Sequence, residues 1–269
     1  MKCIDWLIFK YRANRNRNSS FDSDDETSTG FLGVSDFSDK SIWKALVAEC
    51  LGTFILVLIG TGSCITMGNA PADAAQIRIA FTFGLTVATL AQAIGHISGC
   101  HINPAVTFSL LLTGDVKLVK AVCYVVVQCV GAIGGSGLLK LIVPDERVGG
   151  FGVTSIGDKS LSPVQGMIME AILTFLLIFV IHGVCDSYRK DIKGSAPLAI
   201  GLAVVAAHLV GIQFTGSSIN PARSFGPAVI MNSWENHWIY WVGPLAGAAV
   251  AAVFYKLLFK VHKEESYDL

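Results

Sequence analysis

Residues 101–106 read His-Ile-Asn-Pro-Ala-Val, and residues 218–223 read Ser-Ile-Asn-Pro-Ala-Arg. In both copies an Asn is followed by Pro, Ala and residues that suit a helix. Asn is a favoured N-cap, and Pro suits the first helical position because an N–H there would have no partner. The repeated motif therefore predicts two helices, one beginning after Asn103 and one after Asn220.

Both predicted helices are short. The first ends near Leu112, because Thr113-Gly114-Asp115 follows it. About ten residues at ~1.5 Å each span ~15 Å, half of a hydrocarbon core that is ~30 Å thick. Two half-length helices at matching positions in two halves of a chain indicate a site at mid-depth in a membrane.

The composition is that of a membrane protein. Of the 269 residues, 52% are hydrophobic and only 15% are charged, and the mean hydropathy is +0.58. Soluble domains carry about 25% charged residues, so this chain is too apolar for that class. The formal net charge of zero gives no reason to expect a nucleic-acid partner. We predict an all-α membrane protein with six transmembrane helices plus the two half-helices. The expected spans are 43–66, 78–96, 117–142, 164–185, 197–213 and 237–259.

Basic residues predict the orientation of these spans. Six spans place both chain ends on one side of the membrane. Lys and Arg gather in the N-terminal tail, after the first half-helix, in the 186–196 connection and at the C-terminal end. On the other side lie only Arg78, Lys140, Arg147 and Lys159. Because basic residues are enriched on the cytosolic side, we expect both termini in the cytosol, and the plasma membrane is the expected location.

Two acidic residues show that half of the chain is repeated. Glu49 opens the first span and Glu170 the fourth, each followed by a similar run that ends in Thr-Phe. Their separation is close to that between Asn103 and Asn220. Three spans per repeat is an odd number, so the second repeat is inverted relative to the first. A buried carboxylate is unfavourable and has a purpose, either as a proton relay or as an acceptor for the non-helical backbone before each motif. The matched pair favours the second role.

The polar ends of the chain form tails. The first forty residues have a basic run followed by an acidic one, a composition that cannot bury a core. Ser19 and Ser20 follow the basic run and a kinase could modify them, but an unmodified tail is favoured. We expect a disordered cytosolic tail at 1–42, a membrane domain at 43–260 with repeats at about 43–142 and 164–260, and a cytosolic tail at 261–269.

Runs of small residues at 131–137 and 243–247 allow helices to approach closely. The sequence leaves open whether this packing lies within one subunit or between subunits. Seven Cys residues show no paired spacing and are interpreted as packing residues in apolar helices.

The two half-helices would place their N-termini at one point. Each N-terminus carries about half a positive charge, so a cation is repelled there. The carboxamides of Asn103 and Asn220 cap their own helices and keep N–H groups for one passing water. A water that accepts from both turns its hydrogens outward, which interrupts proton hopping. Non-helical backbone at this depth lines a cavity. Its carbonyls are expected to accept from water at Gly99, Cys100, His101, Gly216, Ser217 and Ser218.

Arg223 is the most informative charged residue. It lies in the first turn of the second half-helix, where the helix dipole opposes a cation, and Val106 takes its place in the first repeat. A residue that is both unfavourable and asymmetric is not there for packing. With Asn220 at mid-depth, Arg223 should face the external mouth.

The paired Asn-Pro-Ala motifs (Asn103, Pro104, Ala105 and Asn220, Pro221, Ala222), with Gly-His-Ile-Ser-Gly before the first and Arg-Ser-Phe-Gly-Pro after the second, resemble the major intrinsic protein (aquaporin) family. The resemblance covers about residues 43–260. It implies a passive water channel that works as a homotetramer in the lipid bilayer, with Glu49 and Glu170 bracing the loops. It also implies a four-residue constriction, formed by Phe83, His208, Ser217 and Arg223.

The resemblance is to the water-selective members. Glycerol-conducting relatives usually have a small residue at the position of His208 and Asp at that of Ser224, and Tyr240-Trp241 match the aromatic pair of water channels. Many members carry Cys where Ser217 stands, so mercurial block through that position is not expected. Cys100, beside the first motif, is the remaining candidate.

Other readings fit the residues less well. His96, Cys100 and His101 resemble metal ligands, but Asn103-Pro104 reassigns them to a pore loop, so we expect no metal and no cofactor. A channel that also passes hydrogen peroxide, urea, ammonia or glycerol is the alternative within the class. A secondary transporter would need a coupling-ion site, and an adhesive protein would need larger external loops. An enzyme is not expected, since no nucleophile–base set or phosphate-binding Gly-Lys motif occurs.

Overall fold

The structure is a computed structural model that describes residues 32–33, 39–65, 71–157, 160–189, 191–192 and 194–261. Within these residues the secondary structure is helical and no strand occurs. The expectations for Ser19 and Ser20, for nearly all of the N-terminal tail and for 262–269 lie outside the described residues.

Among the residues that the structure describes, six helices are long and apolar enough to cross a membrane, which confirms the predicted fold class. Their ends agree with the apolar segments to within a few residues, with one larger difference. The second helix begins six residues earlier than the segment starting at Arg78, because Ala-rich sequence after Pro71 favours a helix without being strongly apolar. The helices are α3 (Lys40–Gly62), α4 (Ala72–Ser98), α6 (Leu118–Ile142), α7 (Pro163–Cys185), α8 (Ala196–Thr215) and α10 (Ile239–Leu258).

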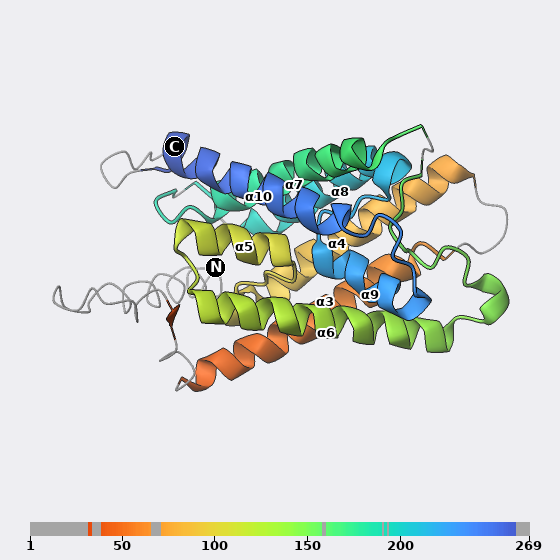
Figure 1. The fold of residues 1–269 in the computed structure, drawn as a ribbon. Helices are drawn as coiled ribbons and strands as arrows, with labels where there is room; N and C mark the ends of the chain where they lie inside the picture. Colours follow the sequence, from red (N-terminus) through yellow and green to blue (C-terminus); the bar gives the residue numbers. More distant parts are fainter. Residues whose placement is uncertain are drawn as a thin grey trace.

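The two half-helices are α5 (Pro104–Thr113) and α9 (Pro221–Met231). Each begins at the predicted residue, with an extended Asn as N-cap whose side chain accepts from the first turn. They enter the bundle from opposite ends (Figure 1). A 3-10 turn, η2 (Asp145–Arg147), lies in the connection between the repeats.

Helix packing follows the repeat. Helix α3 packs on α6 and α7 on α10, while α4 and α8 pack on each other across the two halves. Each half-helix packs on the last long helix of the other repeat, α9 on α6 and α5 on α10. The two repeats are therefore joined by exchanged elements rather than by one flat interface.

Glycines allow these close contacts. A Cβ at Gly131 would lie 2.2 Å from the Cys50 carbonyl oxygen, and one at Gly247 would lie 2.0 Å from that of Ala171. Both distances are far below van der Waals contact, so only Gly fits. The small-residue runs in α6 and α10 thus serve packing within one chain, which the sequence had left open.

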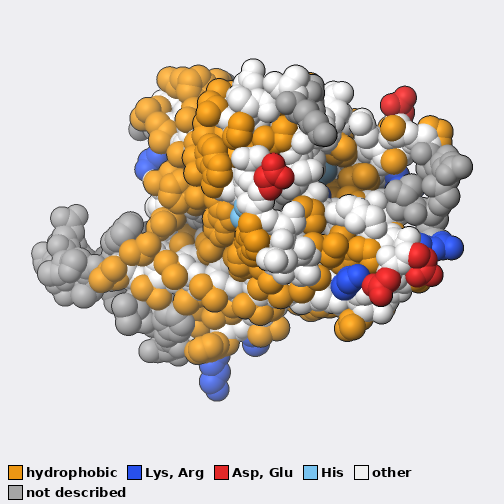
Figure 2. All heavy atoms as spheres, turned by 45° about the vertical axis from the view of Figure 1, so that its right-hand side comes forward, with side chains coloured by type: hydrophobic (Ala, Val, Ile, Leu, Met, Phe, Trp, Pro, Cys, Tyr) orange, Lys and Arg blue, Asp and Glu red, His pale blue; other side chains and the backbone are white. Residues whose placement is uncertain are grey.

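The outer surface is apolar. Large hydrophobic side chains such as Val122, Val126 and Leu141 are more than half exposed on α6. Figure 2 shows hydrophobic side chains covering most of one face of the bundle. This is the surface expected of helices that face lipid.

Candidate functional site

Two non-helical segments, 99–103 and 216–220, lead into the half-helices. Their backbones match residue by residue. Gly99 and Gly216 have positive φ angles, as do Cys100, Ile102, Ser217 and Ile219 at 43° to 52°. Side-chain-bearing residues rarely adopt this region, so the surrounding structure must hold them in it.

Glu49 holds the first segment. Its side chain is fully buried on α3. Oε1 accepts from Ser98 Oγ at 2.6 Å and from the N–H of His101 at 2.9 Å, and Oε2 accepts from the N–H of Ile102 at 2.6 Å. Gln128 Nε2 on α6 donates to Oε2 at 2.8 Å. Four donors on one carboxylate stabilise its charge without a basic partner.

Glu170 holds the second segment in the same way. Oε1 accepts from Thr215 Oγ1 at 2.6 Å and from the N–H of Ser218 at 2.8 Å, and Oε2 accepts from the N–H of Ile219 at 2.8 Å. Two tyrosines repeat the pattern. Tyr124 Oη donates to the Ser98 carbonyl and Tyr240 Oη to the Thr215 carbonyl, each at 2.9 Å. Both carboxylates thus accept from backbone N–H groups of the segment that leads into a half-helix.

The Asn-Pro-Ala motifs meet back to back. Oδ1 of Asn103 accepts from the N–H of Ala105, and Oδ1 of Asn220 accepts from those of Ala222 and Arg223. Nδ2 of Asn103 then donates to the Ile219 carbonyl, and Nδ2 of Asn220 donates to the Ile102 carbonyl, both at 2.8 Å. Each amide therefore has one N–H committed to the opposite loop and one left.

Three side chains from three helices form a second cluster. The rings of Phe83 (α4) and His208 (α8) stack with centroids 4.7 Å apart. The guanidinium carbon of Arg223 (α9) lies 4.7 Å from the Phe83 ring centroid. Arg223 Nη1 donates to the Gly152 carbonyl at 2.6 Å. Ser217 lies shortly before Arg223 in the sequence, but its hydroxyl donates to the Ala207 carbonyl at 3.4 Å.

The polar atoms of this cluster have a definite arrangement. His208 Nδ1 lies 3.0 Å from the Val204 carbonyl, which can only accept, so Nδ1 carries the hydrogen. In the neutral ring Nε2 is then an acceptor. Among the described residues, neither His208 Nε2 nor Arg223 Nε has a partner, although both are buried. The cluster thus offers one acceptor and one donor to a passing molecule.

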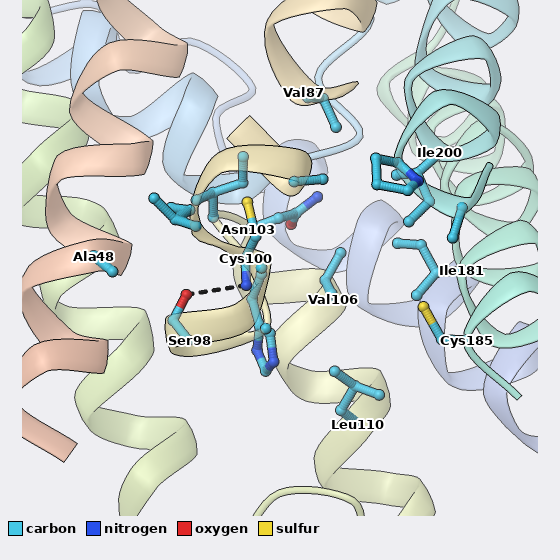
Figure 3. A pocket seen from close by; sticks show the side chains of 18 of the residues that line it. Ala48, Val87, Ser98, Cys100, Asn103, Val106, Leu110, Ile181, Cys185 and Ile200 are labelled. Atoms are coloured by element: carbon cyan, nitrogen blue, oxygen red, sulfur yellow. Dashed lines mark hydrogen bonds between the residues drawn. The ribbon is translucent and has the colours of Figure 1, made fainter. Parts of the chain in front are cut away.

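A cavity of about 2260 Å³ connects these features. Its lining includes Asp115, Asp186, Lys260 and Cys100. In Figure 3, Val106 and Leu110 of α5 face Ile181 and Ile200 across it, and Asn103 lies next to Cys100. Both motif Asn residues line it, as do Phe83, His208 and Arg223. No hydrogen bond from a described residue reaches the carbonyls of Gly99, Cys100, His101, Gly216, Ser217 and Ser218.

Within the described chain, no group of three or more His, Cys, Asp or Glu residues is placed to hold a metal. His101 instead pairs through Nδ1 with Thr107 Oγ1 at 3.1 Å.

A family model described as Major intrinsic protein matches residues 36–255. The chain belongs to the major intrinsic protein family. It is 49% identical to Aquaporin-4 of Mus musculus over 222 residues, covering 82% of this chain and 68% of that one. It is 49% identical to Aquaporin-5 of Sus scrofa, covering 79% of each chain, and 41% identical to Aquaporin-1 of Homo sapiens, covering 87% of this chain and 89% of that one.

The fold of this major intrinsic protein also matches a solved structure. The aquaglyceroporin from Plasmodium falciparum superimposes with a TM-score of 0.72, covering 81% of this chain and 96% of that chain. The two sequences are 24% identical, so the likeness concerns the fold alone.

Two residues that take part in the site were missed in the sequence. Gln128 donates to Glu49 and to Thr107. Its polar side chain inside an apolar span was a usable signal. Gly152 accepts from Arg223, but a loop glycine in a Gly-rich connection carries no such signal.

Proposed function

We propose that this chain is a passive water channel, in which water passes in single file along the cavity and through the Phe83–His208–Arg223 cluster. The observation that carries this proposal is the pair of motif amides, each bound to the opposite loop, lying inside the cavity where two helix N-termini meet. Similarity to proteins named aquaporin-4 supports water as the permeant.

Ion exclusion follows from the half-helices. Two N-termini, each equivalent to about half a positive charge, oppose a cation at the motifs. The remaining N–H of Asn103 and that of Asn220 donate to the same water oxygen. Such a water has both hydrogens directed along the path and away from the centre, so no proton is passed through it. The exposed carbonyls on either side accept from the waters before and after it.

The Phe83–His208–Arg223 cluster acts as the selectivity constriction. Phe83 and His208 form a stacked wall, and Arg223 is held against that wall by Gly152. Arg223 donates to a water oxygen and His208 Nε2 accepts a water hydrogen. A bulkier polyol cannot keep its hydroxyl groups paired on the apolar Phe83 side, so glycerol is disfavoured.

We further propose that both termini lie in the cytosol, that the channel resides in the plasma membrane and that it assembles as a homotetramer. The start of α3 and the end of α10 lie at one end of the bundle (Figure 1), and Lys40, Lys44, Lys256 and Lys260 flank it. Basic residues are enriched on the cytosolic side. The apolar outer faces leave room for neighbouring subunits as well as lipid.

The proposal is tested with the purified full-length protein in proteoliposomes. Stopped-flow light scattering after an osmotic step should show faster shrinkage than in empty liposomes, while glycerol uptake stays at the background level. Equal shrinkage rates, with insertion verified by protease protection, would overturn the water-channel proposal.

A further inference from the structure

The connection between the two repeats passes close to the constriction. Phe151 in this connection is 1% exposed and packs in a hydrophobic cluster with Leu139. Further along, the N–H of Gly157 donates to the Phe214 carbonyl at 2.9 Å. Residues 151–157 are therefore fixed to the bundle at both ends, and we call them the anchored segment.

Two hydrogen bonds join the anchored segment to the start of α9. Arg223 Nη1 donates to the Gly152 carbonyl at 2.6 Å, and Thr154 Oγ1 donates to Ser224 Oγ at 2.8 Å. Gly152 and Thr154 are two residues apart, and Arg223 and Ser224 are neighbours. The bond between Thr154 and Ser224 therefore fixes the register in which the Gly152 carbonyl meets the guanidinium.

The hydroxyl of Thr154 is the first in a chain of three. Ser224 Oγ donates to Ser218 Oγ at 2.6 Å, and Ser218 Oγ donates to the Asn220 carbonyl at 2.9 Å. A carbonyl can only accept and each hydroxyl has one hydrogen, so the direction of every bond in the chain is determined. Thr154, Ser218 and Ser224 are at most 5% exposed, so bulk water does not compete for these bonds. The chain links the connection between the repeats to the second Asn-Pro-Ala motif.

The orientation of Arg223 depends on the Gly152 carbonyl. The guanidinium lies against the Phe83 ring, and Nε has no partner among the described residues. A displaced Gly152 carbonyl would leave Nη1 unpaired in a buried site, which is unfavourable, so the guanidinium would follow the carbonyl. Thr154 does not line the cavity, whereas Arg223 does. An effect of Thr154 on permeation therefore acts through a residue such as Arg223.

We propose that Thr154 is a positioning residue for Arg223. Its bond to Ser224 holds the Gly152 carbonyl where that carbonyl orients the guanidinium, and the exclusion of small polar solutes depends on this orientation. The effect on solutes rests on the proposed water-channel function, whereas the effect on the anchored segment does not.

The experiment compares Thr154→Val, which removes the hydroxyl and keeps the shape of the side chain, with Thr154→Ser, which keeps the hydroxyl. Thr53→Val is the matched control, because the Thr53 hydroxyl is also buried but donates within its own helix, to the Glu49 carbonyl at 2.8 Å. The full-length proteins are reconstituted in proteoliposomes. Osmotic shrinkage measures water permeability, urea uptake measures solute permeability, and hydrogen–deuterium exchange with mass spectrometry follows residues 148–157.

We expect Thr154→Val to raise the ratio of urea to water permeability roughly threefold, the effect of losing about one hydrogen bond. Thr154→Ser and Thr53→Val should keep the wild-type ratio. In an Arg223→Val background, Thr154→Val should raise the ratio no further, because residues that act through one another are not additive. Amide exchange in residues 148–157 should be faster in Thr154→Val and unchanged in Thr154→Ser.

Ser224→Ala removes the same bond from the side of α9 and should raise the ratio as well, which keeps the test available if Thr154→Val does not fold. Ser224→Ala leaves the Thr154 hydroxyl without its acceptor, and the double variant with Thr154→Val removes that hydroxyl. The double variant should therefore melt at a higher temperature than Ser224→Ala, while its ratio stays raised.

The proposal would be overturned by an unchanged ratio in Thr154→Val, by an equal rise in Thr154→Ser or Thr53→Val, or by a further rise in the Arg223→Val background. A wild-type ratio in the double variant would also overturn it. A wild-type protein without water permeability would instead refute the proposed function, and the exchange rates would still test whether Thr154 holds the anchored segment.

Discussion

Arg223 makes the contacts that give the constriction its polarity. It bonds to the Gly152 carbonyl and lies against the Phe83 ring, all while almost fully buried. A buried cation without a carboxylate partner is unfavourable in a membrane and is retained for a functional reason. Arg223 is therefore the first residue to test by substitution.

Replacing Arg223 by Val, the residue at the matching position of the first repeat, removes the donor and widens the constriction. We expect water permeability to persist while glycerol or urea uptake rises above the background, because the barrier to larger polar solutes is lost. Solute uptake and osmotic shrinkage are measured on the same vesicles. Arg147→Val, on the exposed 3-10 turn, is the control, and unchanged solute exclusion in Arg223→Val would contradict the filter role.

The two buried carboxylates make a prediction about stability. In Glu49→Gln the side chain keeps its shape but presents an NH₂ group toward backbone N–H donors. Loss of these charge-assisted bonds should cost about 3 kcal/mol and lower the apparent melting temperature in detergent. Glu170→Gln should behave alike, since its contacts match.

The exposed Glu146→Gln is the matched control for both carboxylates, and it should melt like wild type. A Glu49→Gln protein that is as heat-stable as wild type would show that the loop does not depend on this carboxylate.

Helices α3 and α6 approach each other closely at glycines. A Cβ at Gly135 would lie 2.4 Å from the Phe54 carbonyl oxygen, whereas one at Gly137, half a turn further, would meet only Ile230 Cδ1 at 3.8 Å. The same helix thus carries a position that excludes a methyl group and one that accepts it.

Gly135→Ala should therefore separate α3 from α6 and lower thermal stability by about 1–3 kcal/mol, the usual range for overpacking. Gly137→Ala should be neutral or slightly stabilising, because Ala is the better helix former. Melting curves of the two variants, recorded side by side, check this. Equal melting temperatures for Gly135→Ala and Gly137→Ala would show that α3 and α6 can separate without loss of stability.

The helix pattern was largely predictable. The starts of α5 and α9 follow from Asn-Pro, because capping is a local interaction between residues two or three positions apart. The start of α4 was missed because an apolar-segment criterion overlooks alanine-rich turns.

For the assembled bundle, the exchange of half-helices between repeats is the main structural fact. Helix α5 packs on α10, α9 packs on α6, and the motif amides bind across the same boundary. Each repeat contributes only one of the two half-helices, so neither repeat alone can form the pair that meets at the motifs.

A protease site inserted between residues 158 and 159 tests this. After cleavage we expect the two fragments to stay together in size-exclusion chromatography and to retain water permeability, because the exchanged helices hold them. The first repeat expressed alone should aggregate, since α6 would lack α9 and α5 would lack α10. A monodisperse first repeat with native helicity would contradict the prediction.

Local residue patterns were enough to predict the spans, the half-helix starts and the two buried carboxylates, because periodicity, capping and charge burial act over short stretches of chain. The grouping of Phe83, His208 and Arg223 came from family resemblance, not from spacing. The bond from each amide to the opposite loop and the acceptor at His208 Nε2 emerged only from the packed structure. They join segments far apart in sequence, and their geometry depends on how whole helices approach one another.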